Sequence, residues 1–227
     1  MAKERKMIEL KNVVKEYIDG SQKNTILQDI NLSIGEHDFI TIQGKSGGGK
    51  STLLNLIGLL TEPTSGQILY EGKEINYKKE SEYEQIRREK VGLVFQTPNL
   101  ISCLSPIDNI LLPAVRNTQV NPKKYAKELL EKVDLKDKLH AKTKALSGGE
   151  AQRIAIVRAL INNPQIILCD EPTGALDEET GKKVIKLLCE IWEERKCAMI
   201  IVTHDKNIAQ IGKRQMILDG GHLHEVE

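Results

Sequence analysis

The most specific chemical pattern in the chain is a glycine-rich run that ends in a lysine and two hydroxyl residues. It fits the pattern G-x-x-x-x-G-K-[ST] and reads Gly44-Lys45-Ser46-Gly47-Gly48-Gly49-Lys50-Ser51-Thr52. Glycines let consecutive backbone N–H groups curve around phosphate oxygens, and the N-terminus of a following helix adds a partial positive charge. Lys50 is expected to reach the β- and γ-phosphates of a nucleotide, and the Ser51 hydroxyl is expected to bind Mg²⁺. We call residues 44–52 the phosphate loop.

This pattern alone fits an NTPase or a kinase. The alternative is a glycine-rich turn between a strand and a helix that binds nothing, which arises by chance in on the order of one chain in a hundred. The expected strand before Gly44 and the expected helix after Lys50 are the flanks that the phosphate-binding motif requires.

Two carboxylates follow the apolar run Ile166–Cys169. Asp170 is expected to hold Mg²⁺ through water, as in other phosphate-loop enzymes. Glu171 comes one residue later and is expected to polarise the attacking water as a general base. The alternative is an acidic turn after a buried strand.

A second candidate anion site begins at Ser147. Ser147 and Glu150 form the Ser-x-x-Glu pattern of a capping box, which would start a helix with no further function. Gly148 and Gly149 are not explained by capping, because glycine in a first turn costs about 1 kcal/mol against alanine. Exposed amides, a hydroxyl and a helix dipole together predict phosphate binding. Capping and phosphate binding are compatible.

Gln96 and His204 each follow an expected strand, Val91–Phe95 and Ala198–Thr203. The phosphate loop and Asp170 have the same position relative to their own strands. Ligands of open α/β sheets bind beyond the carboxyl ends of the strands. Four such positions therefore predict one site at that edge.

The elements that position these residues alternate between short apolar strands and helices, which predicts an α/β fold with a mainly parallel sheet. Strands are expected at Met7–Tyr17, Thr25–Ile34, Asp38–Ile42, Gln67–Tyr70, Val91–Phe95, Gln165–Cys169, Ala198–Thr203, Arg214–Leu218 and His222–Val226. Helices are expected at Lys50–Leu60, Glu80–Lys90, Gly148–Asn162, Glu178–Arg195 and Asp205–Ile211, with a helical pattern over Thr97–Leu146. We expect one domain over 1–227 with a helical subdomain at about 97–162.

Composition narrows the class of protein. Charged residues make up 29% of the 227 residues and the formal net charge is +1, so the overall balance does not favour nucleic acid or an anionic membrane surface. The four cysteines have no metal-ligand spacing, which favours reduced thiols in a cytosolic protein. The charged start Met1–Lys6 has no signal-peptide core, and no apolar run approaches the roughly 20 residues that span a bilayer. Any work on a membrane would need another chain.

With these residues in this order, the sequence resembles the nucleotide-binding subunits of ABC transporters over nearly its whole length. The matching motifs are Walker A at Gly44–Thr52, the Q-loop glutamine at Gln96, the signature motif at Ser147–Arg153, Walker B at Ile166–Glu171, the D-loop at Gly174–Asp177 and the switch histidine at His204. Tyr17 resembles the aromatic residue that stacks on adenine, although an ordinary strand tyrosine is the alternative. Further short segments resemble the MacB and LolD branch of lipoprotein-release, macrolide-export and peptide-resistance ATPases.

The resemblance implies ATP and Mg²⁺ as cofactors and a P-loop NTPase (RecA-like) core with an N-terminal antiparallel β subdomain and an inserted helical subdomain. It implies catalytic roles for Lys50, Gln96, Glu171 and His204, and metal binding by Ser51, Gln96 and Asp170. It implies nucleotide contacts from the phosphate loop, Tyr17, Ser147, Gly148, Gly149, Glu150 and Asp177.

The resemblance also implies partners. Two copies would sandwich two ATP molecules, each site joining one copy's phosphate loop to the other's signature motif, on the cytoplasmic side of a membrane. Residues Pro98–Leu104 would contact a transmembrane permease, the alternative being a plain surface loop. An ABC ATPase acting on nucleic acid or ribosomes is disfavoured, because its second domain, linker or insertions are missing. A regulator of cell-wall hydrolases stays open.

Several positions depart from the family pattern. Lys45 and Gly48 stand in the phosphate loop where proline and serine are usual. Glu150 and Ala151 replace two glutamines, and His37 replaces a turn glycine. None of these changes removes a catalytic group, but Lys45 and Glu150 alter the charge near the nucleotide.

Overall fold

The computed structural model describes residues 6–20, 22–115 and 121–226. It forms two compact units, Met1–Arg87 with Lys196–Glu227 (unit 1) and Arg88–Arg195 (unit 2), and each is described by itself. The start Met1–Lys6, for which the sequence predicts no signal peptide, lies outside the described residues except for Lys6. No helix in the described part of the chain combines the length and the apolar character that a membrane crossing needs.

Unit 1 contains an antiparallel sheet with the strand order β2–β1–β4–β5. Its strands are β1 (Lys6–Asp19), β2 (Gln22–Gly35), β4 (Ser65–Tyr70) and the two-residue β5 (Lys73–Glu74). Alternate residues of β1, such as Ile8 and Leu10, are buried, as expected for strands that cover a core with one face. The predicted N-terminal antiparallel subdomain is confirmed, and β5 was not foreseen.

Unit 1 also contains parallel strands. β3 (Phe39–Gly44) lies between β8 (Ala198–Thr203) and β9 (Arg214–Asp219) and is parallel to both. The hairpin strand β10 (His222–Glu225) pairs antiparallel with β9. Every residue of β8 is buried, which is typical of a strand covered on both faces.

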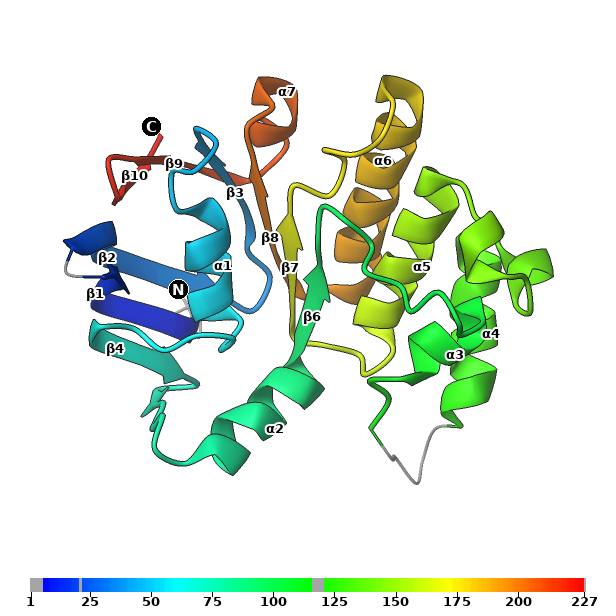
Figure 1. The fold of residues 1–227 in the computed structure, drawn as a ribbon, viewed down its shortest axis with the longest axis horizontal. Coiled ribbons are helices and arrows are strands. Elements are labelled where there is room, and N and C mark those ends of the chain that lie inside the picture. The colour runs from blue at the N-terminus through cyan, green and yellow to red at the C-terminus, as the bar shows by residue number, and fades with distance from the viewer. Residues whose placement is uncertain (1–5, 21, 116–120, 227) are drawn as a thin grey trace, which may run out of the picture. The chain divides into compact units, whose positions relative to one another are not determined.

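Helix α1 (Lys50–Ile57) contacts both sets of strands in unit 1, namely β1 and β2 on one side and β3 and β8 on the other. Figure 1 shows it, in cyan, between the antiparallel strands and β3. The sequence predicted a helix to Leu60, but it ends earlier, because Gly58 caps it and Leu59 has a left-handed φ of 55°. The short helix α7 (Lys206–Ala209) contacts β3 and β8.

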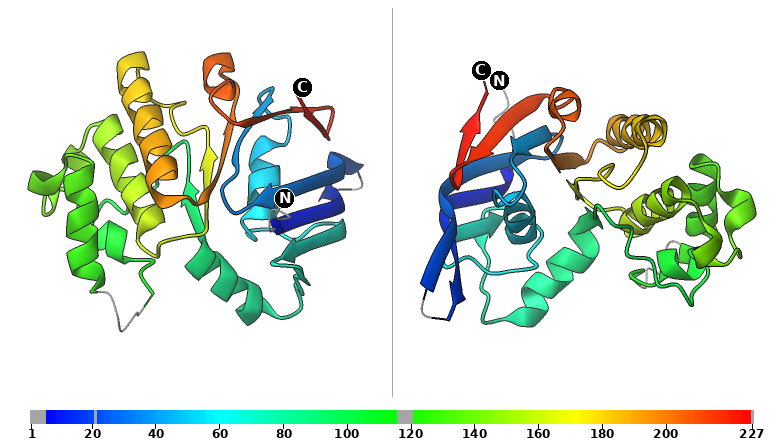
Figure 2. Two further views of the ribbon diagram at one scale, coloured as in Figure 1. Left: turned by 180° about the vertical axis from the view of Figure 1, so that it is seen from behind. Right: turned by 45° about the horizontal axis from the view of Figure 1, so that its top comes forward.

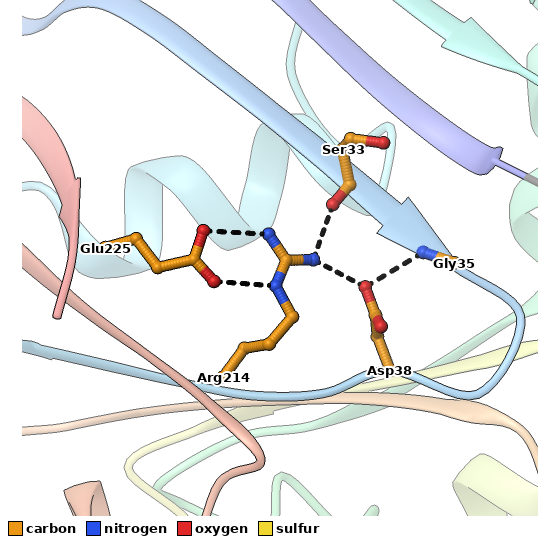
Figure 3. Close-up of polar contacts among 5 residues, drawn as sticks. All are labelled: Ser33, Gly35, Asp38, Arg214 and Glu225. Atoms are coloured by element: carbon orange, nitrogen blue, oxygen red, sulfur yellow. Dashed lines mark hydrogen bonds and ion pairs between the residues drawn. The ribbon is translucent and has the colours of Figure 1, made fainter. Parts of the chain in front are cut away.

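A cluster of polar contacts fixes the start of β3 (Figure 3). The Arg214 guanidinium donates to both carboxylate oxygens of Glu225 at 2.8 and 3.2 Å, to Asp38 Oδ2 at 2.6 Å and to the Ser33 carbonyl at 2.8 Å. Asp38 Oδ2 also accepts from the Gly35 N–H at 2.9 Å. One side chain on β9 therefore holds β10, the end of β2 and the residue before β3, the strand that leads into the phosphate loop.

Unit 2 contains the parallel pair β6 (Val91–Val94) and β7 (Ile166–Asp170). Between these strands the described chain forms α3 (Pro106–Leu111), α4 (Pro122–Lys132), two single 3₁₀ turns, η1 (Lys136–Lys138) and η2 (Thr143–Ala145), and α5 (Gly148–Leu160). Helix α6 (Glu178–Arg195) follows β7, and Figure 2 shows α5 and α6 side by side from two further directions. Helix α2 (Glu80–Lys90) contains the boundary at Arg87 between the two units.

The α/β fold class is confirmed, with parallel strands in both units and helices inserted between β6 and β7. The helical pattern predicted over 97–146 is less extensive than expected. α3 and α4 each begin at a proline, preceded by a capping side chain, Ser105 and Asn121 respectively. Prolines suit the first position of a helix and not its interior, so they divide this segment into short helices.

Candidate active site

The phosphate loop connects β3 to α1 in unit 1. Gly47 and Gly49 have φ values of 74° and 93°, which other residues rarely adopt. An added Cβ at Gly44 would lie 2.8 Å from the carbonyl oxygen of Leu218, so the loop also needs glycine where it leaves the strand. Lys45, Ser46 and Gly47 are exposed. The backbone therefore forms the open, side-chain-poor curve that a phosphate group requires.

Lys50 is buried, and its ammonium group lies against the phosphate loop. Lys50 Nζ donates to the carbonyl oxygens of Gly44 and Lys45, each at 2.9 Å. These bonds hold the positive charge at the loop itself. Ser51, the next residue, is exposed in the first turn of α1, which leaves its hydroxyl accessible to a metal ion bound with the phosphates.

His204 and the phosphate loop leave neighbouring strands of unit 1 at the same edge. β3 and β8 are parallel and in register from Phe39 opposite Met199 to Gln43 opposite Thr203. The next residue on each strand begins the loop on one side and is His204 on the other. The structure thus brings together two of the four predicted strand-end positions.

Tyr17 lies near the end of β1 with 45% of its surface exposed. The Lys15 ammonium lies 5.1 Å from the centre of its ring and also donates to the Glu62 carbonyl at 2.8 Å. A cation over one ring face is a favourable arrangement. The contact holds the ring while much of it stays exposed to a ligand.

Gln96 and the pair Asp170–Glu171 come together in unit 2. β6 and β7 are parallel, with Val94 opposite Cys169, so both chains leave at one edge. The amide of Gln96 lies against Gly174, where an added Cβ would be 2.6 Å from Gln96 Nε2. The glutamine therefore reaches the turn that follows the two carboxylates.

Glu171 has a left-handed backbone conformation, with φ of 45°. Its carbonyl accepts from the Gly174 N–H at 3.0 Å, which closes a tight turn. A positive φ in a residue other than glycine costs about 1–2 kcal/mol and is concentrated at functional sites. The turn directs the chain away from β7 immediately at this carboxylate.

The predicted capping box at the start of α5 is present. Ser147 Oγ accepts from the Glu150 N–H at 3.3 Å, and Glu150 Oε2 accepts from the Ser147 N–H at 2.8 Å. One of the two glycines has a packing reason that the sequence did not reveal, because an added Cβ at Gly149 would lie 2.3 Å from the Thr180 side chain. Gly148 is exposed, with Leu176 at 3.3 Å from such an atom. Glycine therefore lets α5 pack closely on α6 at Gly149, while Gly148 stays exposed.

The bond with the Ser147 N–H and the nearby Lys138 ammonium hold the pKa of the Glu150 carboxyl group below its ordinary value, against the opposing effect of burial. Lys138 Nζ lies 3.3 Å from Glu150 Oε1. Asp177 is also a helix cap, since it accepts from the Thr180 N–H at 3.0 Å and that bond lowers its pKa. The N-termini of α5 and α6, which pack closely at Gly149 and Thr180, thus each have a carboxylate as a cap.

Two polar side chains of α5, the buried Gln152 and the half-buried Arg158, were missed from the sequence. Gln152 has 0% of its surface exposed, and its Nε2 donates to the Phe95 carbonyl at 3.0 Å. The Arg158 guanidinium donates to the carbonyls of Pro98 at 2.7 Å and Asn99 at 2.8 Å, and burial lowers its pKa. Both hold the main chain on either side of Gln96. The available signal was that Gln152 and Arg158 stand on either side of the apolar run Ile154–Val157.

A third polar residue, the buried Asn109, holds the segment after Asn99. Its Oδ1 accepts from the Ile101 N–H at 2.7 Å, and its Nδ2 donates to the Ile101 and Ser105 carbonyls, both at 3.1 Å. The Thr143 hydroxyl donates to the Leu104 carbonyl. The main chain over 98–105 is therefore fixed by hydrogen bonds to side chains elsewhere in unit 2, while the Ile101 side chain is 41% exposed.

Within the described ranges, no three or more His, Cys, Asp or Glu side chains are grouped to hold a metal ion. The candidate metal ligands of each unit are instead a serine hydroxyl next to the phosphate loop and, separately, Asp170 with Gln96. Such a sparse set of oxygen ligands fits Mg²⁺, which is bound by one or two protein groups together with substrate phosphates.

Comparisons with known proteins agree with these motifs. The family model described as "ABC transporter" matches residues 27–174. An uncharacterized ABC transporter ATP-binding protein, MJ0796 of Methanocaldococcus jannaschii, is 43% identical over 97% of both chains. A solved dimeric structure of MJ0796 superposes with a TM-score of 0.89, covering 97% of this chain and 98% of that one at 42% identity. A second solved structure of MJ0796 is a dimer in a post-hydrolysis state bound to ADP and Pi, with a TM-score of 0.87 at 41% identity, covering 97% and 98% of the two chains.

Two relatives with more specific names are also similar. The lipoprotein-releasing system ATP-binding protein LolD of Idiomarina loihiensis is 37% identical over 96% of this chain and 97% of its own. The macrolide export ATP-binding/permease protein MacB of Aggregatibacter actinomycetemcomitans is 41% identical over 96% of this chain, which matches 34% of MacB. The chain belongs to the ABC transporter family as one of its ATP-binding proteins, and it binds and hydrolyses ATP.

Proposed function

We propose that two copies of this chain bind two ATP molecules between them and drive a separate transmembrane permease from the cytoplasmic side of a membrane. The observation that carries this proposal is the pair of strand-end groups, Lys50 with the phosphate loop and Gln96 with Asp170–Glu171, in a chain of this family. The relatives LolD and MacB favour export or extraction of a lipoprotein, peptide or drug-like cargo.

Residues of the phosphate loop, Gln96 and the two carboxylates at the end of β7 have distinct roles in hydrolysis. Lys50 neutralises the β- and γ-phosphates, while the loop amides bind their oxygens. Ser51, Asp170 and Gln96 would hold Mg²⁺. That ion would supply positive charge next to the phosphate oxygens. Glu171 accepts a proton from the attacking water.

The remaining residues complete nucleotide binding. His204 contacts the γ-phosphate beside the attacking water, and Tyr17 stacks on adenine with the ring face that Lys15 leaves open. The signature segment, residues 147–153, offers the amide of Gly148 and the hydroxyl of Ser147 to the γ-phosphate of the nucleotide bound by the other copy. Asp177 contacts the same composite site from its turn.

Residues Pro98–Leu104, the docking loop, would meet the permease. Arg158, Asn109 and Thr143 hold its main chain through carbonyl and amide groups. This arrangement leaves the Ile101 side chain exposed on a backbone that is rigidly fixed. A fixed backbone with an exposed apolar side chain is suited to an interface, since little conformational entropy is lost on binding.

Glu171→Gln tests the general base. Glutamine keeps the shape and the hydrogen bonds of glutamate but cannot accept the proton, so ATP should bind while hydrolysis falls by about 10²-fold or more. An ATP-bound dimer should then accumulate in gel filtration. Normal turnover in this variant would contradict the assignment.

A mixed dimer tests the arrangement between copies. Lys50→Ala damages the phosphate loop, and Ser147→Arg fills the anion site of the signature segment, so each variant alone has two damaged composite sites. In a mixed dimer both lesions can fall in one composite site and leave the other intact. Mixing the two inactive proteins should restore measurable ATPase activity. A demonstrated mixed dimer without recovered activity would count against this arrangement.

A further inference from the structure

The carboxylate of Glu150 stands in the part of α5 where the proposed function needs an anion to bind. It is fixed in the first turn of the helix by its bond with the Ser147 N–H at 2.8 Å. Only 19% of the side chain is exposed, so water screens its charge incompletely. An ionised carboxylate in this place would repel a phosphate and oppose the helix dipole that attracts it.

Lys138 removes much of this repulsion. Its Nζ lies 3.3 Å from Glu150 Oε1, the oxygen that the Ser147 N–H does not use, and 38% of the side chain is exposed. Its backbone is held in the 3₁₀ turn η1, where the Lys138 N–H donates to Leu135 and its carbonyl accepts from the Ala141 N–H. The ammonium is thus presented to the carboxylate from a separate, ordered element.

We propose that Lys138 sets the affinity of the signature segment for nucleotide. Its ammonium neutralises Glu150, so the N-terminal turn of α5 stays attractive to the phosphates of the ATP held by the second copy. This inference rests on the proposed function, in which that segment completes a site across the dimer. Lys138 acts on the nucleotide through Glu150 and is a positioning and charge-compensating residue rather than a catalytic one.

The same turn provides a matched control. Lys136, two residues earlier, pairs with Glu131 at 2.6 Å, with side chains that are 66% and 61% exposed. Lys136→Met removes the same charge from the same turn and breaks an ion pair that does not include the signature segment. An effect of Lys138 that acts through total charge alone would appear equally in both variants.

The test is a double-mutant cycle in the Glu171→Gln protein, read as the ATP concentration that gives half-maximal dimer in analytical ultracentrifugation. Glu150→Gln keeps the capping bond, because glutamine also serves in a capping box. Lys138→Met should raise the required ATP concentration by about three- to tenfold when Glu150 is present, and by less than twofold when Glu150→Gln is present. Lys136→Met should have no effect, and about 0.5 M salt should reduce the Lys138→Met effect.

A second measurement separates this effect from a damaged fold. The affinity of the dilute monomer for a fluorescent ATP analogue reports the copy's own phosphate loop and should be unchanged in Lys138→Met. If that variant does not fold, Lys138→Gln takes its place.

The outcomes distinguish a failure of the role of Lys138 from a failure of the proposed ATP-bound dimer. A dimer that forms with ATP but requires the same concentration in all four proteins of the cycle would overturn the role of Lys138. An equal shift with Glu150 and with Glu150→Gln would also overturn it. If the Glu171→Gln parent forms no dimer with ATP, the proposed arrangement fails, and the inference fails with it.

Discussion

Gly174→Ala should reduce catalysis without unfolding the protein, because the new methyl group meets a side chain that can move. The added Cβ would lie 2.6 Å from Gln96 Nε2 and 3.2 Å from its Cδ. Gln96 is exposed, so its amide can rotate away. The backbone of residue 174 need not adjust, since no left-handed φ is involved.

The size of the effect follows from this contact. Gln96 must withdraw from 2.6 Å to beyond 3.0 Å, and a change of rotamer costs about 0.5–1.5 kcal/mol. For a chain of this size that cost corresponds to a melting temperature lower by at most about 6 °C. In the proposed function Gln96 holds the metal and the attacking water, and a displacement of about 1 Å would lower turnover by up to about 10²-fold. We therefore expect kcat to fall by about 10- to 100-fold.

Gly92→Ala is the matched control, because the same nominal clash involves main chain. An added Cβ at Gly92 would lie 2.6 Å from the Ala159 carbonyl oxygen and 3.1 Å from Pro164. The first atom belongs to the main chain of α5 and the second to a buried proline ring. Neither can rotate away, so overpacking should cost about 1–3 kcal/mol. That loss corresponds to a melting temperature lower by about 2–12 °C.

Steady-state ATPase kinetics and thermal unfolding of both variants show whether each substitution lowers kcat or the melting temperature. Gly174→Ala in the Gln96→Ala background should have no further effect on kcat, since the displaced group is already missing. Wild-type kcat in Gly174→Ala would refute the idea that the position of Gln96 matters. A loss of stability in Gly174→Ala as large as that in Gly92→Ala would refute the premise that the clash is relieved by a side chain.

Three further outcomes follow from the polar clusters. Arg158→Met should speed amide hydrogen exchange in the docking loop by about tenfold or more, measured by mass spectrometry, and Arg158→Lys should restore part of the protection, because the bonds run to carbonyl oxygens. Glu225→Gln should lower the free energy of unfolding at pH 7 by about 0.5 kcal/mol. Because Arg214 lowers the pKa of the Glu225 carboxyl group, the stability difference between wild type and variant, measured by denaturant unfolding, should shrink as the pH falls below 4.5 and the carboxylate is protonated. Ile101→Glu should abolish membrane co-purification with little change in basal ATPase activity, since its exposed side chain is part of the docking loop alone.

Local sequence was sufficient for elements whose ends are set by local chemistry. The bounds predicted for Glu80–Lys90, Glu178–Arg195 and Ala198–Thr203 are those observed. It was insufficient between 97 and 146, where capped prolines divide a helical pattern. It also missed the two-residue strand Lys73–Glu74, which forms only by pairing with β4.

The candidate site shows the same division. The phosphate loop and the carboxylates after β7 could be predicted because a continuous run of residues specifies each of them. The packing role of Gly149 could not be predicted, because its reason is Thr180 on another helix. The ion pair of Glu150 with Lys138 also depends on tertiary structure, since nothing in the sequence places η1 beside the start of α5.

Helix α5 combines three constraints that conflict if they are considered separately. In the proposed function its first turn needs accessible amides to bind an anion, and it also needs close packing on α6 and a side chain that caps the helix. Gly148 satisfies the first and Gly149 the second, while Glu150 satisfies the third but introduces a negative charge. Lys138 then compensates this charge from outside the helix. Farther along the same helix, Gln152 and Arg158 donate hydrogen bonds to the main chain on either side of Gln96. A displacement of α5 driven by nucleotide at its first turn would therefore also move the docking loop.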